Sequence, residues 1–350
     1  MFEELLKCAV QKGASDIHIT AGAPPIARIN GDLVPIGSEK LDAADTEAIV
    51  KEVLGKEHLE EYRLKGETDL SYSVKGLGRF RISVYRQRGS SSMALRVVAL
   101  RIPTMEELGL PESVGELARK TRGLVLVTGP AGSGKSTTLA AMIDLINRER
   151  NCHILTLEDP IEYLHKHNKS IVNQREIGYD SRTFAAGLRA ALRQDPDVIL
   201  VGEMRDLETI STAITAAETG HLVLSTLHTI GADKTVDRIV DVFPPYQQQQ
   251  IRVQLSAVLQ GVVSQNLVNS SDGRKRLLAV EVMIATPAIR NLIREGKTHQ
   301  IMTSMQTGGK YGMQTMDAAL AKLYKDGLIR YECALMYCSS EEALMRFIGG

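Results

Sequence analysis

Residues 129–136 read GPAGSGKS and match the pattern G-x-x-x-x-G-K-[ST] in full. The pattern constrains the fold strongly, because it works only between a buried strand and the start of a helix. An apolar run at 124–127 precedes it, and a helix is predicted at 137–147. The glycines let the backbone curl so that successive N–H groups point at phosphate oxygens, and the helix N-terminus adds partial positive charge. The sequence therefore predicts a phosphate-binding loop in an α/β protein.

The residue types in this loop assign its chemistry. We expect Lys135 to reach the β- and γ-phosphates of ATP, the predicted substrate, and Ser136 to ligate Mg²⁺. The predicted nucleotide-binding residues are Gly129, Ala131, Gly132, Ser133, Gly134, Lys135, Ser136 and Thr137.

Short apolar runs alternate with predicted helices in the second part of the chain. They are nearly continuous in Val, Ile and Leu, which is typical of strands buried on both faces of a parallel sheet. These runs are residues 124–127, 154–157, 198–201 and 222–227. A hairpin is predicted around 269–273 with its return strand at 277–282, and the last hundred residues are expected to be mainly helical.

Three of these predicted strands are followed by ionisable residues, namely Glu158, Glu203 and His228. Ligands of an open parallel sheet bind outside the carboxyl ends of its strands, so these side chains should meet the phosphate-binding loop. Hydrolysis needs one carboxylate for the attacking water and one near Mg²⁺, which it ligates directly or through water. The spacing does not decide between Glu158 and Glu203. We favour Glu158 for water and Glu203 for Mg²⁺, and place His228 at the γ-phosphate.

The first hundred residues follow another pattern. Residues 1–101 are predicted as an α+β domain, in which Asn30-Gly31 is the turn of a β-hairpin and 91–99 the last strand. Residues 102–121 are rich in Pro and Gly and are predicted as a linker with a short helix. Residues 122–350 then form the nucleotide-binding domain with a helical C-terminal part.

Composition excludes several functions. The 42 basic and 42 acidic side chains cancel, and the chain has no Trp and five Phe, so nucleic acid is not an expected partner. A membrane span is not predicted because no apolar run approaches about 18 residues. The first residues are acidic where a secretory signal would be basic, and the four cysteines form no C-x-x-C pair. We expect a cytoplasmic location.

Four segments in order resemble the secretion ATPases of type II secretion and type IV pili. GPAGSGKSTTLAAMID, LEDPIEY, DPDVILVGEMRD and TGHLVLSTLHT are similar to the Walker A, Asp box, Walker B and His box of that superfamily. SDIHIT and EELGLP extend the similarity over the first domain and the linker. Ala131 stands where Thr is usual, at a position that contributes mainly backbone. The resemblance implies a PAS-like N-terminal domain, a RecA-like ATPase domain and a homohexameric ring.

Two further segments resemble the retraction branch of this superfamily, AIRNLIRE at 288–295 and GMQTMD at 312–317. The resemblance implies ATP-driven pilin disassembly and twitching motility, on a platform protein at the cytoplasmic face of the inner membrane. A second retraction ATPase is a further candidate partner. Other readings are a pilus-assembly or type II secretion motor, an auxiliary retraction subunit with weak hydrolysis, and a nucleic-acid translocase.

A ring of this kind implies that an arginine from a mobile or neighbouring element completes the site. We favour Arg81 and Arg96 in the first domain. The other candidates there are Arg79, Arg86 and Arg88, and those in the ATPase domain are Arg189, Arg193, Arg205 and Arg238.

Overall fold

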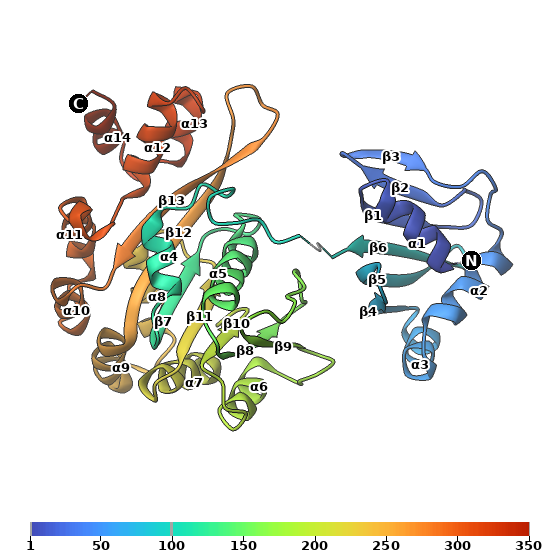
Figure 1. The fold of residues 1–350 in the computed structure, drawn as a ribbon, viewed down its shortest axis with the longest axis horizontal. Helices are drawn as coiled ribbons and strands as arrows, with labels where there is room; N and C mark the ends of the chain where they lie inside the picture. Colours follow the sequence, from blue (N-terminus) through green and yellow to red (C-terminus); the bar gives the residue numbers. More distant parts are fainter. Residues whose placement is uncertain (1, 99–100, 350) are drawn as a thin grey trace. The chain divides into compact units, whose positions relative to one another are not determined.

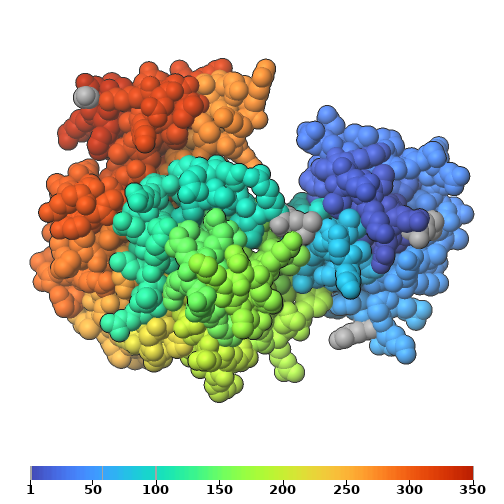
Figure 2. Space-filling view, viewed as in Figure 1, coloured from blue at the N-terminus to red at the C-terminus, as the bar shows by residue number. Residues whose placement is uncertain are grey.

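The computed structural model describes residues 2–98 and 101–349 and has the mixed α/β class expected from the sequence (Figure 1). The chain divides into two compact units, whose residues are coloured along the sequence in Figure 2. The first comprises Met1–Arg101 and Glu162–Leu164, and the second comprises Ile102–Ile161 and His165–Gly350.

The first unit is built on an antiparallel sheet of order β3-β2-β1-β6-β5-β4. Its apolar face packs against the helices of the unit and includes Phe80, Ile82 and Leu95, all at most 1% exposed. The elements are α1 (Phe2–Gln11), β1 (Ala14–Ile19), β2 (Ile26–Ile29), β3 (Asp32–Pro35), α2 (Ala43–Val53), α3 (Lys56–Lys65), β4 (Glu67–Val74), β5 (Gly78–Gln87) and β6 (Ser90–Val97). The predicted strand 91–99 corresponds to β6, and its residue 99 lies outside the described residues.

The predicted hairpin at Asn30-Gly31 is confirmed. Ile29 pairs with Asp32, so the loop contains two residues. Asn30 and Gly31 both have positive φ, 52° and 96°. A two-residue loop of type I′ requires this backbone, and the Asn-Gly dipeptide adopts it at low cost.

The second unit is organised around a sheet of order β13-β12-β7-β11-β10-β8-β9. Neighbours are parallel except for the β12–β13 hairpin. The strands are β7 (Gly123–Thr128), β8 (His153–Glu158), β9 (Ile171–Glu176), β10 (Val198–Val201), β11 (Leu222–Leu227), β12 (Leu259–Asn269) and β13 (Arg276–Ile284). The four predicted apolar strands are confirmed as β7, β8, β10 and β11, whereas β9 and the length of β12 were not predicted.

Helices cover both faces of this sheet, which explains its apolar strands. The helices are α4 (Glu112–Ala118), α5 (Lys135–Glu149), α6 (Phe184–Ala191), α7 (Leu207–Glu218), α8 (Ala232–Asp241), α9 (Pro245–Val258), α10 (Pro287–Arg294), α11 (Ile301–Gln306), α12 (Met316–Lys325), α13 (Tyr331–Tyr337) and α14 (Glu341–Gly349), with 3₁₀ turns at Thr298–Gln300 and Gly309–Tyr311. One buried cluster joins the sheet to α4 and α5, and another joins its opposite face to α6 to α10. None of the described helices combines the length and apolarity that crossing a membrane requires.

The segment predicted as a linker is ordered and packed. It carries a short helix as expected, α4, but Val114 and Leu117 of that helix are at most 1% exposed. They share a cluster with Met105 and with β7 and α5. The Pro and Gly content of residues 102–121 therefore marks turns on the surface of the second unit, which begins at Ile102.

The segment AIRNLIRE lies on α10, and its apolar residues Ile289 and Ile293 are buried, both at 0% exposure. Its basic side contacts α9. Arg290 donates to the carbonyl oxygens of Ser256 (2.6 Å) and Ala257 (2.7 Å) in the last turn of α9. Burial lowers the pKa of Arg290 below its usual value. This arginine therefore caps the C-terminus of α9, where a cation is favoured.

Candidate active site

The phosphate-binding loop lies between β7 and α5, as its motif requires. Gly129, Gly132 and Gly134 have φ values of 141°, 75° and 88°. Only glycine adopts such conformations readily, so each glycine of the loop has a backbone reason. A Cβ atom on Gly129 would lie 2.3 Å from the carbonyl oxygen of Gln265, so this position also needs glycine for space.

Lys135 is folded back over the loop that precedes it. Its side chain is 8% exposed, and Nζ donates to the carbonyl oxygens of Gly129 (2.9 Å) and Pro130 (3.0 Å). A buried ammonium needs such partners, because desolvation disfavours its charge. The lysine is thus held at the loop, where it can exchange carbonyl oxygens for phosphate oxygens.

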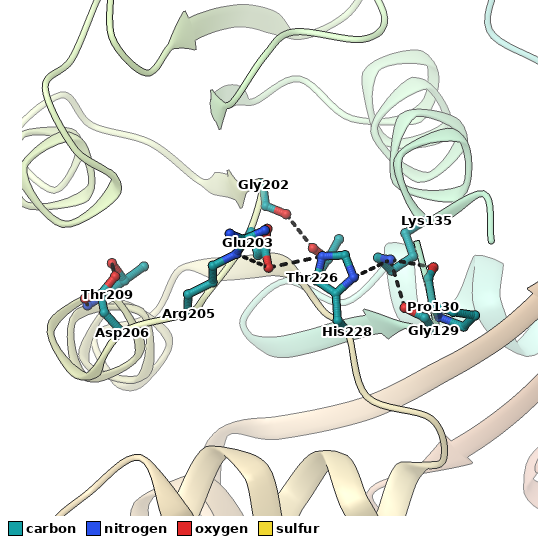
Figure 3. A network of polar contacts seen from close by, with 10 residues as sticks. All are labelled: Gly129, Pro130, Lys135, Gly202, Glu203, Arg205, Asp206, Thr209, Thr226 and His228. Carbon is teal, nitrogen blue, oxygen red and sulfur yellow. Dashed lines mark hydrogen bonds and ion pairs between the residues drawn. The ribbon is translucent and has the colours of Figure 1, made fainter. Parts of the chain in front are cut away.

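A line of polar contacts runs from this lysine to the ends of two neighbouring strands (Figure 3). Nζ of Lys135 lies 3.5 Å from Nδ1 of His228, which follows β11. Nε2 of His228 lies 3.1 Å from Oε1 of Glu203, which follows β10. Arg205 completes the line, with Nε donating to the same carboxylate oxygen at 2.5 Å. The structure thus brings together Lys135, His228 and Glu203, as the strand-end argument predicted.

Sheet order explains this meeting. β11 lies beside β7, and β10 lies beside β11, so their carboxyl ends stand next to the loop. Two hydroxyls on β11 fix the end of β10, since Ser225 Oγ donates to the Val201 carbonyl (2.7 Å) and Thr226 Oγ1 to the Gly202 carbonyl (2.6 Å). The backbone that carries Glu203 is therefore tied to the strand that carries His228.

Glu158 lies one strand further away, at the end of β8. Its Oε1 accepts from Thr156 Oγ1 (2.6 Å) and from Gln174 Nε2 (3.0 Å), on β8 and β9. These contacts hold the carboxylate between β8 and β9, on the side of β8 that faces away from the phosphate-binding loop, whereas Glu203 is the carboxylate that contacts His228. The two predicted carboxylates thus have different surroundings.

Buried hydroxyls test whether this loop fits a nucleotide. Ser133 Oγ and Thr128 Oγ1 are buried and have no hydrogen-bond partner among the described residues. Buried polar atoms are normally paired, so two unpaired hydroxyls at a glycine-rich loop fit a polar ligand such as a phosphate. Ser136 and Thr137 are partly buried in the first turn of α5, where a hydroxyl ligand of Mg²⁺ belongs.

One cavity adjoins the loop, and a second lies beside Glu203. The first, of about 410 Å³, adjoins Gly134, Thr137 and Thr138, and its other walls combine leucines with the charged residues Glu106, Glu107 and Arg276. The other, of about 370 Å³, is lined by Glu203, Arg205 and His228 together with Arg238. A cavity with leucine walls and a few polar groups beside the first turn of α5 suits a nucleoside, and the charged side chains around the second cavity suit a polar group.

Comparison with known proteins gives the family. The model of the type II/IV secretion system protein family matches residues 1–327. The chain belongs to this family. It is 49% identical over 331 residues to the type IV pilus retraction ATPase PilT of Pseudomonas aeruginosa, covering 95% of this chain and 96% of that protein. It is also 43% identical to the type IV pilus ATPase PilU of that organism, over 99% and 91%. A crystal structure of the pilus retraction motor PilT with bound ADP matches with a TM-score of 0.91 and 52% identity, covering 98% of each chain.

The arginines predicted to complete the family's site in trans lie side by side in the first unit. Arg81 on β5 pairs directly with Arg96 on β6. Like charges opposite each other destabilise a sheet, and Asp16 offsets this by accepting from Arg96 Nε at 2.9 Å. Burial alone would raise the pKa of Asp16, but the hydrogen bond and charge of Arg96 lower it below the usual value.

The alternative arginines of the second unit differ in their surroundings. Arg205 and Arg238 line the cavity beside Glu203. Arg189 is paired with Glu208, and Arg193 donates to the Arg189 carbonyl oxygen. Of these four candidates, Arg205 and Arg238 are therefore the two that share a cavity with predicted catalytic groups.

Two buried polar residues on β12 and β13 were not predicted. Gln265 on β12 contacts the phosphate-binding loop directly, and Glu281 on β13 accepts from the backbone N–H groups of Ala232 (2.9 Å) and Met316 (3.3 Å). Burial raises the pKa of Glu281. The one sequence signal that could have identified them is a polar residue inside an otherwise apolar strand, because a buried polar side chain is usually hydrogen-bonded to a specific partner.

Proposed function

We propose that this chain is an ATP-hydrolysing motor that powers type IV pilus retraction. The observation that carries the proposal is the line of contacts from Lys135 through His228 to Glu203, on a complete phosphate-binding loop. The nearly full-length similarity to a pilus retraction ATPase supports the same activity and output. The chain is thus an ATPase whose hydrolysis drives pilin disassembly and twitching motility.

The loop residues would hold the nucleotide. Lys135 binds the β- and γ-phosphates, and Ser136 ligates Mg²⁺. A Mg²⁺ ion held by this residue would supply neutralisation of the negative charge that develops on the phosphates. Ser133, Thr137 and the N–H groups of the loop orient the phosphate chain, and the glycines allow its close approach.

Glu158 and Glu203 divide two tasks between them, orienting the attacking water and completing the Mg²⁺ shell. His228 lies between Lys135 and Glu203, so it is placed to respond to the γ-phosphate. Arg205 holds the Glu203 carboxylate in one orientation, which keeps it from turning away from the site.

The motor is proposed to act as a homohexamer, in which Arg81 and Arg96 of one subunit complete the site of another. Their adjacent position on the sheet face opposite the helices supports a shared task. An arginine that enters the site neutralises charge in the transition state. Closure of one unit on the other would then be linked to hydrolysis.

The proposed place of action is the cytoplasmic face of the inner membrane, on a pilus platform protein, with a second retraction ATPase as a further partner. The similarity to PilU over nearly the whole chain favours one second candidate, an auxiliary retraction subunit. The complete set Lys135, Ser136, Glu158 and Glu203 favours the hydrolysing motor over that reading.

The test measures ATPase rate per subunit against protein concentration, with molar mass determined in the same samples. We expect activity to rise as hexamers form and Lys135→Ala to abolish it. Hydrolysis that is independent of concentration in a monomer would contradict the shared site. Expression in a non-twitching retraction mutant should restore twitching with the wild type and not with Lys135→Ala.

A further inference from the structure

Gln265 on β12 is a buried amide in direct contact with the phosphate-binding loop. Its side chain is 0% exposed. Nε2 donates to the carbonyl oxygen of Ser133 (2.7 Å), and Oε1 accepts from Thr138 Oγ1 (3.0 Å). One amide therefore fixes both the end of the loop and the first turns of α5, although β12 lies more than a hundred residues further along the chain.

The loop also packs closely on this residue. A Cβ atom on Gly129 would meet the Gln265 carbonyl oxygen at 2.3 Å, and one on Gly134 would meet its Nε2 at 3.3 Å. The first and last glycines of the motif are thus both closely packed against Gln265. A close-packed interior transmits a shift of one group to the groups that touch it, so this residue controls the shape of the loop.

Ser264, the preceding residue, faces the other side of the sheet. It is 1% exposed, and its Oγ accepts from the backbone N–H of Gly231 at 3.0 Å. Gly231 lies three residues after His228 and precedes α8. On β13, Glu281 pairs with Ser264 and accepts from the next N–H, that of Ala232. The loop that carries His228 therefore ends on β12 and β13.

We propose that Gln265 and Ser264 are positioning residues that set two loops of the site from one strand. Gln265 shapes the phosphate-binding loop, and Ser264 sets the loop that carries His228. Because they are neighbours on β12, a shift of this strand moves both loops together. The inference rests on the proposed function only in requiring that the chain binds and hydrolyses ATP.

The test separates binding from turnover. Binding of a fluorescent ADP analogue should be weakened about tenfold in Gln265→Leu, the effect of losing a buried hydrogen bond. KM for ATP should rise with it. Ser264→Ala should instead lower kcat about three- to tenfold and leave KM within about twofold, because it acts through His228.

Val263→Ala is the matched control. Val263 lies on the same strand and face as Gln265 and is fully buried, but packs in the apolar cluster. It should lower Tm and leave nucleotide affinity unchanged. Gln265→Leu and Thr138→Val should be non-additive in affinity, because they remove two sides of one hydrogen bond.

Two results would overturn the inference. One is a folded Gln265→Leu variant that binds the ADP analogue as tightly as the wild type. The other is that Gln265→Leu and Ser264→Ala both change KM and kcat, with the same division between the two constants in each variant. If Gln265→Leu does not fold, the smaller Thr138→Val change carries the affinity test. If the wild type itself binds and hydrolyses no ATP, the proposed function fails instead, and Lys135→Ala in the same assay identifies that case.

Discussion

The two sheets of this molecule present their functional residues in different ways. The sheet of the second unit is buried on both faces, so chemistry is confined to the carboxyl ends of its strands. The sheet of the first unit is covered by helices on one face, and its other face carries Arg81 and Arg96 in the middle of their strands. In the second unit, a position at the carboxyl end of a strand therefore identifies a candidate site residue. In the first unit, the alternation of side chains along a strand identifies only the face of the sheet on which a residue lies.

The two groups of residues also differ in what holds them together. Lys135, His228 and Glu203 are joined by contacts within one unit, so their association depends on no other part of the assembly. Arg81 and Arg96 lie opposite each other on neighbouring strands, and Arg96 forms an ion pair with Asp16 of the same unit. Their task requires a partner surface, and it can be tested only where that surface is present.

The largest effect is expected at the strand ends of the second unit. Glu203→Gln and Glu158→Gln should each lower kcat by about 100- to 1000-fold, since each removes a carboxylate used in the transition state. Mg²⁺ dependence separates their roles. The variant of the Mg²⁺-shell residue should need more Mg²⁺ for half-maximal rate, and the variant of the water-orienting residue should not. If both variants kept nearly wild-type kcat, the prediction of catalytic residues from their position at the strand ends would be wrong.

The arginines of the first unit should have a smaller effect, and only in the assembled protein. Arg81→Ala and Arg96→Ala are each expected to lower kcat about 10- to 100-fold in hexamers, with unchanged binding of the ADP analogue. Arg63→Ala is the control, because Arg63 is exposed on α3, on the helix-covered side of the unit. An equal loss of kcat in all three variants would indicate a general effect of removing positive charge. The two sides of the first unit would then not differ in their contribution to catalysis.

Sequence patterns predicted the parts of the fold that depend on local chemistry. The glycines of 129–134, the Asn30-Gly31 turn and the apolar strands are of this kind, because backbone conformation and burial restrict the residues allowed there. The strand-end argument also placed Glu203 and His228 together, because parallel strands share an edge.

Contacts between distant segments could not be predicted in this way. Gln265 and Thr138 are 127 residues apart, and no local pattern reports that β12 lies beside β7. β9 was missed because its sequence, IVNQRE, is largely polar and stands at the edge of the sheet. The packed linker shows the same limit, since turn-rich composition does not reveal which core a segment joins.

A smaller effect is expected on stability, and it should be confined to the core of the second unit. His165 belongs to the second unit, its Nδ1 is buried without a partner among the described residues, and burial lowers its pKa to about 4. In the unfolded chain the pKa is about 6.5, so between these values the unfolded state binds more protons. Stability is therefore complete above pH 6.5 and falls as pH decreases towards 4.

At pH 5 the loss should be about 2 kcal/mol relative to pH 7, which corresponds to a lower Tm of roughly 4–8 °C for the second unit. Thermal unfolding at both pH values measures it, in the wild type and in His165→Gln, which cannot take up the proton. The pH-dependent shift should shrink by that amount in the variant. Because the cores of the two units are separate clusters, the transition of the first unit should respond equally in both proteins. A transition of the first unit that changes with His165→Gln would mean that the two cores unfold as one, and the contrast between the two sheets would then hold for their chemistry and not for their stability.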